Sequence, residues 1–431
     1  MTEAFMWDIK NILVFPCGSE IGLELHRALK YSRHINLIGG SSVDDHGRFV
    51  YESYVDCIPF ATDPDFVSAI SRLVQRYEID AIYPAMDSVI ASLAGAEKSL
   101  GCKVIGSPTE TAMTCCSKRQ TYEQLVGILR TPKIYESIDE VDDFPVFMKP
   151  DVGYGTRGAT RISNKGEALA HFQEYPGSLI LEYLPGREFT VDCFTDRKRH
   201  LQFVGPRLRR RVVNGISVNT VPTKNDSERF GELARRINHK MVLRGAWFFQ
   251  VKEREDGELV LLERAARIGG SSSLYRNLGV NFALLSIFDA FDEDVVVSVN
   301  SFSIEMDRAL SNRYKIDLDF DTVYVDLDDT LIVNGQVNAD LVGLLYNFLN
   351  KGKKLILLTK HTDDAKQTLA RWRIDSLFDE IIQIGANENK IDHMKRYRAI
   401  FIDDSYAERK RTVERGIPVF SPDACECLAD T

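Results

Sequence analysis

The sequence predicts a multidomain protein that combines α/β and α+β folds. Its 431 residues exceed what one hydrophobic core usually accommodates, so two or three domains are expected. Strand-like and helical segments alternate strictly near both ends of the chain, whereas strands dominate the middle. Breaks at Ser107-Pro108 and in the polar residues 311–317 separate the three blocks. We therefore expect domains over residues 1–107, 108–313 and 318–431.

Composition and charge narrow the classes of partner. Hydrophobic residues make up 44% and charged residues 27% of the chain, as in most globular proteins, and the net charge is −9. Because nucleic-acid-binding proteins usually carry a basic face, we expect no nucleic-acid partner. The N-terminus lacks a secretory-signal pattern and no apolar run is long enough to span a bilayer, so we expect a cytoplasmic protein without a membrane partner. The eight cysteines follow no zinc-binding spacing and suit a reducing compartment.

One stretch departs from the acidic balance, the run Arg-Leu-Arg-Arg-Arg over residues 207–211. A solvated strand or loop is the leading interpretation of this run. An anion-binding flap is only the alternative, because a run of charged residues alone is weak evidence for a binding site.

The first block predicts a parallel sheet with helices on both faces. Its expected strands cover residues 11–16, 34–38, 81–84 and 103–106. Gly18 and Gly22 open the first helix, where backbone N–H groups suit an anion, but a plain turn is favoured because the full G-x-G-x-x-G pattern is missing. Asp87 follows a strand end and is a candidate substrate contact. A single helix is expected over residues 88–100.

The first candidate binding motif of the second block is a lysine followed by a glycine-rich loop. Lys149 precedes the loop Gly153-Tyr154-Gly155-Thr156-Arg157-Gly158, whose glycines let the backbone fold closely over phosphate oxygens. Ser117 is an expected helix N-cap, and Lys118 beside it supplies a second cation. The expected phosphate contacts are Lys118, Lys149, Gly153, Gly155, Thr156, Arg157 and Gly158.

Four further side chains complete a nucleotide site. Glu182 ends an apolar strand, and together with the backbone of Tyr183 and Leu184 it suits the adenine amino group. Glu188 is placed to accept ribose hydroxyls. Gln250 and Glu263 end two strands joined by the turn Glu255-Asp256-Gly257, which predicts a hairpin that sets them side by side as Mg²⁺ ligands.

Residues 10–310 resemble the ATP-grasp superfamily, in its carbamoyl-phosphate-synthetase-like and carboxylate–amine ligase branch. The motifs that carry the resemblance are Lys118, Lys149-Pro150, residues 153–158, residues 182–188, Gln250 and residues 263–267. The resemblance implies a Rossmann-like domain before the grasp fold, and Mg²⁺-ATP (with Mn²⁺ as an alternative metal) bound between two α+β halves. It also implies transfer of the γ-phosphate to a carboxylate, followed by attack of an amine on the acyl phosphate.

One residue departs from that family pattern. The metal-binding strand usually reads Glu-x-Asn-x-Arg, but here Ala265 stands at the asparagine position, between Glu263 and Arg267. Alanine cannot coordinate a metal, which puts the second Mg²⁺ in doubt. Arg267 remains and suits a developing acyl phosphate, so it is a candidate catalytic residue. The alternative is a grasp domain that binds nucleotide without ligating.

The third block contains the stretch Val-Asp-Leu-Asp-Asp-Thr over residues 325–330. Asp326 follows the expected strand 322–325, and three later features also stand at strand ends or helix starts. These features are Thr359, Lys390 and the pair Asp403-Asp404. In a parallel sheet the carboxyl ends of the strands meet at one edge, so we expect the four features to converge.

This set of residues supplies what phosphoryl transfer requires. Asp326 suits a nucleophile that forms an aspartyl phosphate, and Asp328 suits the acid and base. Thr359 and Lys390 suit the phosphate oxygens. The expected Mg²⁺ ligands are Asp326, Asp328 through its carbonyl, Asp403 and Asp404.

The four motifs resemble the haloacid-dehalogenase (HAD) superfamily, which implies a Mg²⁺-dependent phosphatase with a Rossmann-like parallel sheet. The intervals from Asp326 to Thr359 and from Thr359 to Lys390 leave no room for a cap domain. Such a capless site either accepts large substrates or is covered by another domain, for which the grasp block is the candidate. An inactive module kept as a scaffold is the alternative.

The sequence as a whole predicts a bifunctional enzyme, a carboxylate–amine-type ligase joined to a phosphatase. The expected partners are ATP, a small carboxylate, a small amine and a phosphorylated metabolite. A homo-oligomer is compatible with the sequence. The alternative function is a phosphatase whose front part binds nucleotide or substrate without ligating, and Ala265 is the residue that favours it.

Overall fold

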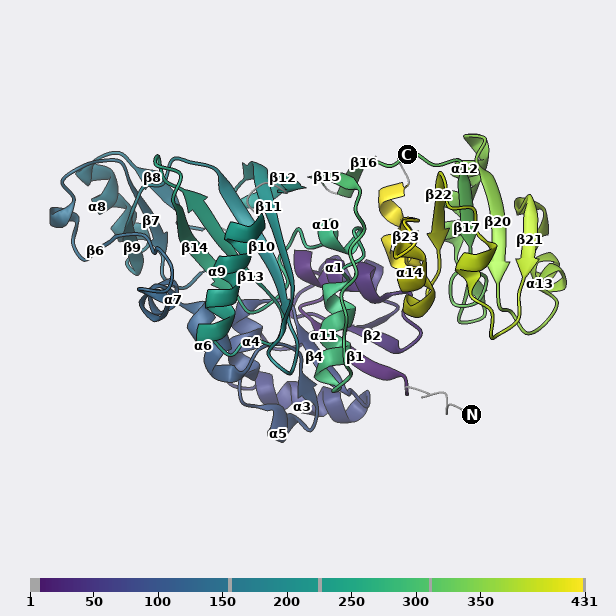
Figure 1. Cartoon of the computed structure of the whole chain (residues 1–431). Helices are drawn as coiled ribbons and strands as arrows, with labels where there is room; N and C mark the ends of the chain where they lie inside the picture. The colour runs from purple at the N-terminus through teal and green to yellow at the C-terminus, as the bar shows by residue number, and fades with distance from the viewer. Residues whose placement is uncertain (1–7, 154–156, 224–226, 310–311, 429–431) are drawn as a thin grey trace.

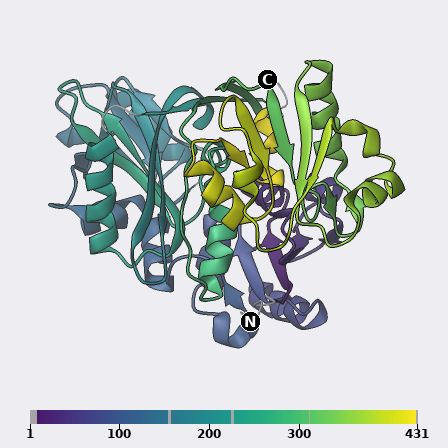
Figure 2. The ribbon, with the colours of Figure 1, turned by 45° about the vertical axis from the view of Figure 1, so that its right-hand side comes forward.

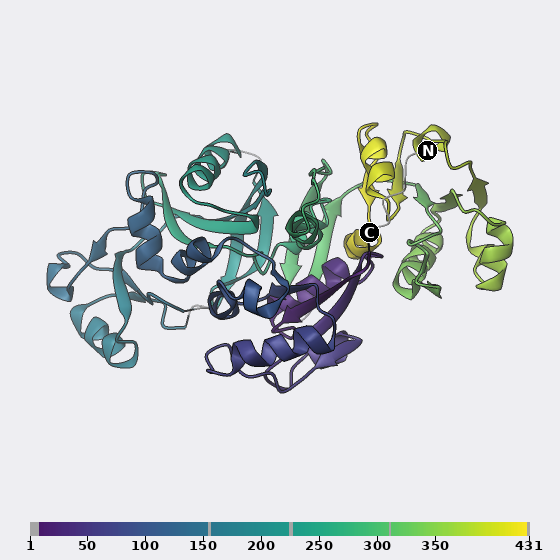
Figure 3. The same ribbon diagram turned by 90° about the horizontal axis from the view of Figure 1, so that it is seen from below.

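The computed structural model describes residues 8–153, 157–223, 227–309 and 312–428. Three units that each contain a sheet are arranged in a row, and the N-terminal unit lies between the other two (Figures 1 and 3). Within the described residues no helix combines the length and apolar character that a membrane crossing needs. The described cysteines, which are all eight of the chain, are free thiols.

The N-terminal unit is built on a five-stranded parallel sheet of order β3-β2-β1-β4-β5. Its strands are β1 (Lys10–Phe15), β2 (Ile35–Gly40), β3 (Ser53–Val55), β4 (Ala81–Pro84) and β5 (Lys103–Val104). Its helices are α1 (Glu20–Leu29), α2 (Gly47–Val50), α3 (Phe66–Arg76), α4 (Asp87–Leu93) and α5 (Glu97–Leu100). The helix expected over residues 88–100 is therefore wrong as a single element. Gly95, with φ +76°, interrupts it, because a left-handed residue cannot continue a right-handed helix.

The middle unit contains two antiparallel sheets. The smaller, of order β6-β9-β7-β8, consists of β6 (Ile134–Tyr135), β7 (Val146–Pro150), β8 (Thr160–Ile162) and β9 (Ser178–Glu182). Helices α6 (Thr109–Cys116), α7 (Lys118–Leu125) and α8 (Lys165–Glu174) and the 3₁₀ helix η1 (Ile138–Glu140) accompany it. Ser117 caps α7 as expected, since its hydroxyl accepts from the Gln120 N–H.

The larger sheet has seven strands in the order β14-β13-β10-β11-β12-β15-β16. They are β10 (Glu188–Thr195), β11 (Leu201–Val213), β12 (Ile216–Pro222), β13 (Gly245–Glu253), β14 (Leu259–Ala265), β15 (Ser303–Arg308) and β16 (Asn312–Asp317). The helices of this part are α9 (Ser227–Lys240), α10 (Ser273–Arg276) and α11 (Phe282–Ala290). Residues 312–317, expected to lie in a linker, instead form the edge strand β16.

The C-terminal unit is a second five-stranded parallel sheet, of order β21-β20-β17-β22-β23. Its strands are β17 (Thr322–Val325), β20 (Lys354–Thr359), β21 (Glu380–Gln383), β22 (Ala399–Ile402) and β23 (Val419–Phe420), beside the small pair β18 (Ile332–Val333) and β19 (Gln336–Val337). Its helices are α12 (Ala339–Asn350), α13 (Ala365–Arg371) and α14 (Tyr406–Val413), with 3₁₀ helices η2 (Asp375–Leu377), η3 (Lys390–His393) and η4 (Pro422–Leu428). The parallel sheet expected here is confirmed.

The C-terminal unit shares a hydrophobic core with the rest of the chain. Residues of α1, α11 and η4 belong to one buried cluster, and Figure 2 shows the C-terminal unit against the N-terminal one. Arg276 ties these elements together, because its guanidinium contacts Glu24 on α1 and Glu426 on η4. Arg276 is 2% exposed and Glu24 is 2% exposed.

We expect Arg276→Met to destabilise the protein strongly. Removing the guanidinium leaves Glu24 buried without its cation, which typically costs about 3–5 kcal/mol of unfolding free energy. Urea unfolding followed by tryptophan fluorescence measures the loss. Arg235→Met is the control, since Arg235 pairs with Glu232 on an exposed face of α9 and such a pair contributes under about 1 kcal/mol. Equal effects of the two substitutions would show that the Arg276 contacts do not hold the units together.

Candidate active sites

Two lysines lie where the small sheet of the middle unit contacts β14 of the large sheet. Lys149, on β7, is buried and donates from Nζ to the Leu262 carbonyl at 2.8 Å. Burial lowers the pKa of Lys149 to about 8, although nearby Glu263 opposes the shift. Lys118 donates to the Asp151 carbonyl at 3.0 Å, and burial together with the Lys149 charge lowers its pKa. The contact between the two sheets therefore holds two cationic side chains, which suit an anionic ligand.

Gln250 and Glu263 lie directly opposite each other on β13 and β14, in the register that the hairpin predicted. The expectation that the two strands end at these residues is wrong, because β13 continues to Glu253 and β14 continues to Ala265. Opposed residues of an antiparallel pair project from the same face, so both side chains offer oxygens to one space. Ala265 lies two residues further along β14 and is buried, with no atom to add to this set.

The glycine-rich loop is described at its two ends. Gly153 and Arg157 are exposed, and Gly158 has φ +69°. The Tyr175 side chain packs close to Gly158, because a Cβ added to Gly158 would lie only 2.8 Å from Tyr175. The predicted phosphate contacts Gly155 and Thr156 lie outside the described residues. The sharp backbone turn at Gly158 is consistent with a loop that approaches another group closely.

The predicted base and ribose contacts lie in and beside the connection from β9 to β10. Glu182 ends β9, and its side chain accepts from the Lys133 N–H at 3.1 Å. Leu184 is buried, whereas Tyr183 is half-buried. Glu188, predicted to accept ribose hydroxyls, is ion-paired with Arg209 in this structure.

Arg209 and Arg207 were not predicted as site residues. They alternate along β11 and project from the same face of the sheet, and both are buried. Arg209 also donates to Gln250 Oε1 at 2.7 Å, and Arg207 pairs with Asp192 at 2.6 Å. The solvated-strand interpretation of the basic run is therefore wrong for these two arginines. The alternation Arg-Leu-Arg was the signal that they share a face.

Arg267 is held by Asp87 of the N-terminal unit. The guanidinium donates to both carboxylate oxygens, at 2.8 and 2.7 Å, and lies over the Phe248 ring. Asp87, the candidate substrate contact, begins α4. The two residues belong to different units, so their pairing fixes the N-terminal sheet against the strand that carries Glu263.

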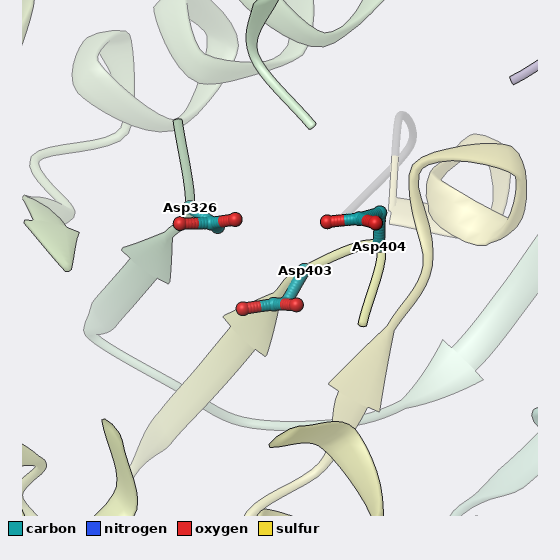
Figure 4. A group of neighbouring side chains, drawn as sticks. All are labelled: Asp326, Asp403 and Asp404. Carbon is teal, nitrogen blue, oxygen red and sulfur yellow. The ribbon is translucent and has the colours of Figure 1, made fainter. Parts of the chain in front are cut away.

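A second site lies at the carboxyl edge of the C-terminal sheet. Asp326, Asp403 and Asp404 each offer an oxygen, and these atoms lie within 4.8 Å of one another (Figure 4). The N–H groups of Asp326 and Asp403 donate to the neighbouring strands, to Ile402 and Phe420, which fixes the two backbones. Lys390 Nζ bridges the carboxylates of Asp326 and Asp403, at 2.6 Å from each.

The three carboxylates of this cluster outnumber its one ammonium group, Lys390, and the cluster is largely buried. Burial raises the pKa of Asp326 and of Asp403, while the ammonium of Lys390 opposes both shifts. Burial and the Asp403 charge raise the pKa of Asp404 to about 6. Three carboxylates with one ammonium form an oxygen-rich site of the kind that Mg²⁺ prefers, so the donor set fits this ion.

The two remaining predicted residues flank the cluster. The Asp328 carboxylate is outside the group of three and instead lies 2.9 Å from His361 Nδ1. Thr359 is the last residue of β20, and its hydroxyl accepts a hydrogen bond from the His361 N–H at 3.0 Å. His361 was missed in the sequence, although its place two residues after a strand end was a signal. It orients Asp328 beside the cluster.

Two antiparallel sheets that meet around a pair of lysines, next to a unit with a parallel sheet, are the arrangement of the ATP-grasp fold. Solved structures of the fold share the arrangement. The biotin carboxylase domain of 2-oxoglutarate carboxylase from Hydrogenobacter thermophilus, in complex with MgADP, ADP and bicarbonate, matches 70% of this chain and 74% of its own at 17% identity, with a TM-score of 0.59. L-amino acid ligase from Bacillus licheniformis matches 70% of this chain and 80% of its own at 16% identity, with a TM-score of 0.57.

Parts of the chain are similar in sequence to ATP-grasp proteins. The model of the family described as ATP-grasp in the biosynthetic pathway with Ter operon matches residues 174–309. D-alanine–D-alanine ligase of Fusobacterium nucleatum is 26% identical over 219 residues, which are 47% of this chain and 72% of the ligase. The carbamoyl phosphate synthase large chain of Thermoplasma acidophilum is 26% identical over 187 residues, 40% of this chain but only 17% of that protein.

Proposed function

We propose that the chain is an ATP-dependent carboxylate–amine-type ligase joined to a Mg²⁺-dependent phosphohydrolase. The observation that carries the proposal is the presence of two separate sets of charged side chains. One set, with Lys118, Lys149, Gln250 and Glu263, lies in the middle unit where its two sheets meet. The other, with Asp326 at its centre, lies at a parallel-sheet edge. The expected substrates are ATP, a small carboxylate, a small amine and a phosphorylated metabolite.

In the ligase half, this chain's own side chains bind and orient the reactants. Lys118 and Lys149 hold the phosphates of ATP through their charges. Gln250 and Glu263 would hold Mg²⁺, which when bound neutralises charge on the phosphate oxygens. Arg267, held rigid by Asp87, faces the developing acyl phosphate. The carboxylate oxygen of the acid attacks the γ-phosphorus and ADP leaves; the amine then attacks the acyl carbon and phosphate leaves.

In the phosphohydrolase half, a carboxylate oxygen of Asp326 attacks the phosphorus and the ester P–O bond breaks. Asp328, oriented by His361, gives a proton to the leaving oxygen and then takes one from the attacking water. That water displaces phosphate from the aspartyl phosphate and restores Asp326. Lys390 and Thr359 stabilise the transferring oxygens. Asp326, Asp403, Asp404 and the Asp328 carbonyl would hold Mg²⁺.

The buried Lys149 gives ATP binding a distinct pH dependence. Burial lowers the Lys149 pKa to about 8, so the free protein carries this charge below that pH and loses it above. We expect ATP affinity to fall by up to about tenfold between about pH 7 and about pH 9. Calorimetric titration with ATP measures this fall. Lys149→Arg, which stays charged, should bind ATP almost independently of pH, and a matching fall in that variant would contradict the assignment.

One residue favours a second candidate function. Ala265 leaves the strand that carries Glu263 without an oxygen donor at that position, which favours a middle unit that binds ATP without ligating. Incubation of Mg²⁺-ATP with pools of carboxylic acids and amines separates the two functions. Release of ADP that depends on both an acid and an amine supports the ligase. ATP binding without such release supports the binding module, and phosphate release from an aryl phosphate tests the other half.

A further inference from the structure

The N-terminal unit covers the loops at the carboxyl edge of the C-terminal sheet. Arg33, just after α1, pairs with Asp329 at 3.0 Å, and Asp329 belongs to the loop that follows β17. Lys30 and Tyr31 both contact Asp340 at the start of α12, at 3.1 and 2.8 Å. The grasp block was the expected cover of this capless site. These contacts bring the N-terminal unit to this edge, and the Tyr406–Val296 hydrogen bond brings the grasp block to it as well.

A cavity of about 580 Å³ lies at the junction. It is bounded by the turn after α1, by α11, by residues 294–300 and by α14. Asp404 of the carboxylate cluster and Arg33 of the covering turn are both among its lining residues. The apolar part of the lining includes Leu284, Leu285, Phe288, Val295 and Val297. Its volume is that of a typical small-molecule pocket, and its lining combines an apolar wall with a few charged groups.

The walls of the cavity are fixed to one another by hydrogen bonds. The Tyr406 hydroxyl of α14 donates to the Val296 carbonyl at 3.0 Å. Asn300 donates from Nδ2 to the Val419 carbonyl of β23 at 2.8 Å. Since these bonds join the segment 294–300 to the C-terminal unit, the cavity is a standing feature of the fold and its shape is preorganised.

We propose that this cavity receives the organic part of the phosphohydrolase substrate, and that the turn after α1 together with α11 and residues 294–300 serves as the cap of that site. This inference rests on the proposed phosphohydrolase function. The substrate class is a small organic phosphate monoester whose leaving group has an apolar body. Such a group fits a pocket with an apolar wall next to Asp404, whereas a phosphoprotein needs an open groove that admits a chain.

Cavity-filling variants test the proposal. Ser298→Trp and Leu285→Trp each place an indole in the cavity lining, and two variants are used because either one could fail to fold. The substrates are phenyl phosphate, which has an apolar leaving group, and acetyl phosphate, whose leaving group is too small to need the cavity. We expect the KM for phenyl phosphate to rise roughly tenfold or more while kcat changes little. The KM for acetyl phosphate should stay unchanged.

The control is Val242→Trp, which adds the same indole at an exposed position outside the cavity lining. It should leave both substrates unaffected. If the filled variants fold and treat the two phosphates alike, or if a phosphoserine peptide is hydrolysed better than phenyl phosphate, the cap proposal is overturned. If the unmodified protein hydrolyses neither acetyl phosphate nor phenyl phosphate, the phosphohydrolase proposal itself fails.

Discussion

Replacing Asp326 by Asn should lower the rate of phosphate ester hydrolysis by at least about 10³-fold, because an amide cannot attack phosphorus. Lys390 would remain in place through Asp403, so the loss would not come from a collapsed site. Colorimetric measurement of phosphate released from phenyl phosphate checks the rate. ATP-dependent ligation by the grasp cleft should be unaffected.

The same substitution has an expected effect on stability that separates chemistry from folding. Burial raises the Asp326 pKa in spite of Lys390, which means that its negative charge destabilises the folded protein when no metal ion is bound. This destabilisation is absent below the ordinary pKa near 4 and grows as pH rises through the raised value. At neutral pH without Mg²⁺, Asp326→Asn should therefore melt no lower than the unmodified protein. A variant that is inactive but also melts far lower would contradict the nucleophile role.

Asp329→Asn provides the matched control for this experiment. It makes the same Asp-to-Asn change three residues further along the same loop. The Asp329 carboxylate pairs with Arg33 and does not belong to the group of three carboxylates. We expect phenyl phosphate hydrolysis to persist in this variant within about tenfold, because a partly exposed ion pair contributes little energy. An equal loss in both variants would assign the chemistry to loop structure rather than to Asp326.

Glu263→Gln should lower ATP-dependent ADP formation by about 10²-fold or more, since an amide holds Mg²⁺ far less well than a carboxylate. The effect should be large because Ala265 leaves Gln250 and Glu263 as the main protein donors on these two strands. An enzyme-coupled ADP assay measures the rate. Glu258→Gln is the control, because Glu258 lies just before the same strand with an exposed side chain. It should leave ADP formation unchanged.

The carboxylate cluster could be predicted from the sequence because it depends on local patterns. Short apolar strands ending in Asp326 and Asp403 place those residues at one edge of any parallel sheet. Lys390 could be placed near them by the same reasoning. The Gln250–Glu263 pairing followed from a hairpin turn, whose length sets the register. In each case the determining information lies within a few residues of the side chain.

The features that the sequence did not reveal depend on contacts between distant segments. Arg207 and Arg209 lie in a run that resembles a solvated charge run, and only the partners Asp192 and Glu188, on the neighbouring strand, show that they are buried. The cover that Arg33 provides joins residues almost 300 positions apart. The edge strand β16 was taken for a linker because its polar residues match an edge strand and a linker equally well.

The central claim is that two independent sites act on phosphorus in this chain. One ³¹P NMR time course tests it, with Mg²⁺-ATP, pools of acids and amines, and phenyl phosphate in the same tube. The unmodified protein should form ADP and also hydrolyse phenyl phosphate. Glu263→Gln should lose the first reaction alone, and Asp326→Asn the second alone. If ADP formation persists in Glu263→Gln and disappears in Asp326→Asn, the C-terminal site hydrolyses the nucleotide and the two-site account is wrong.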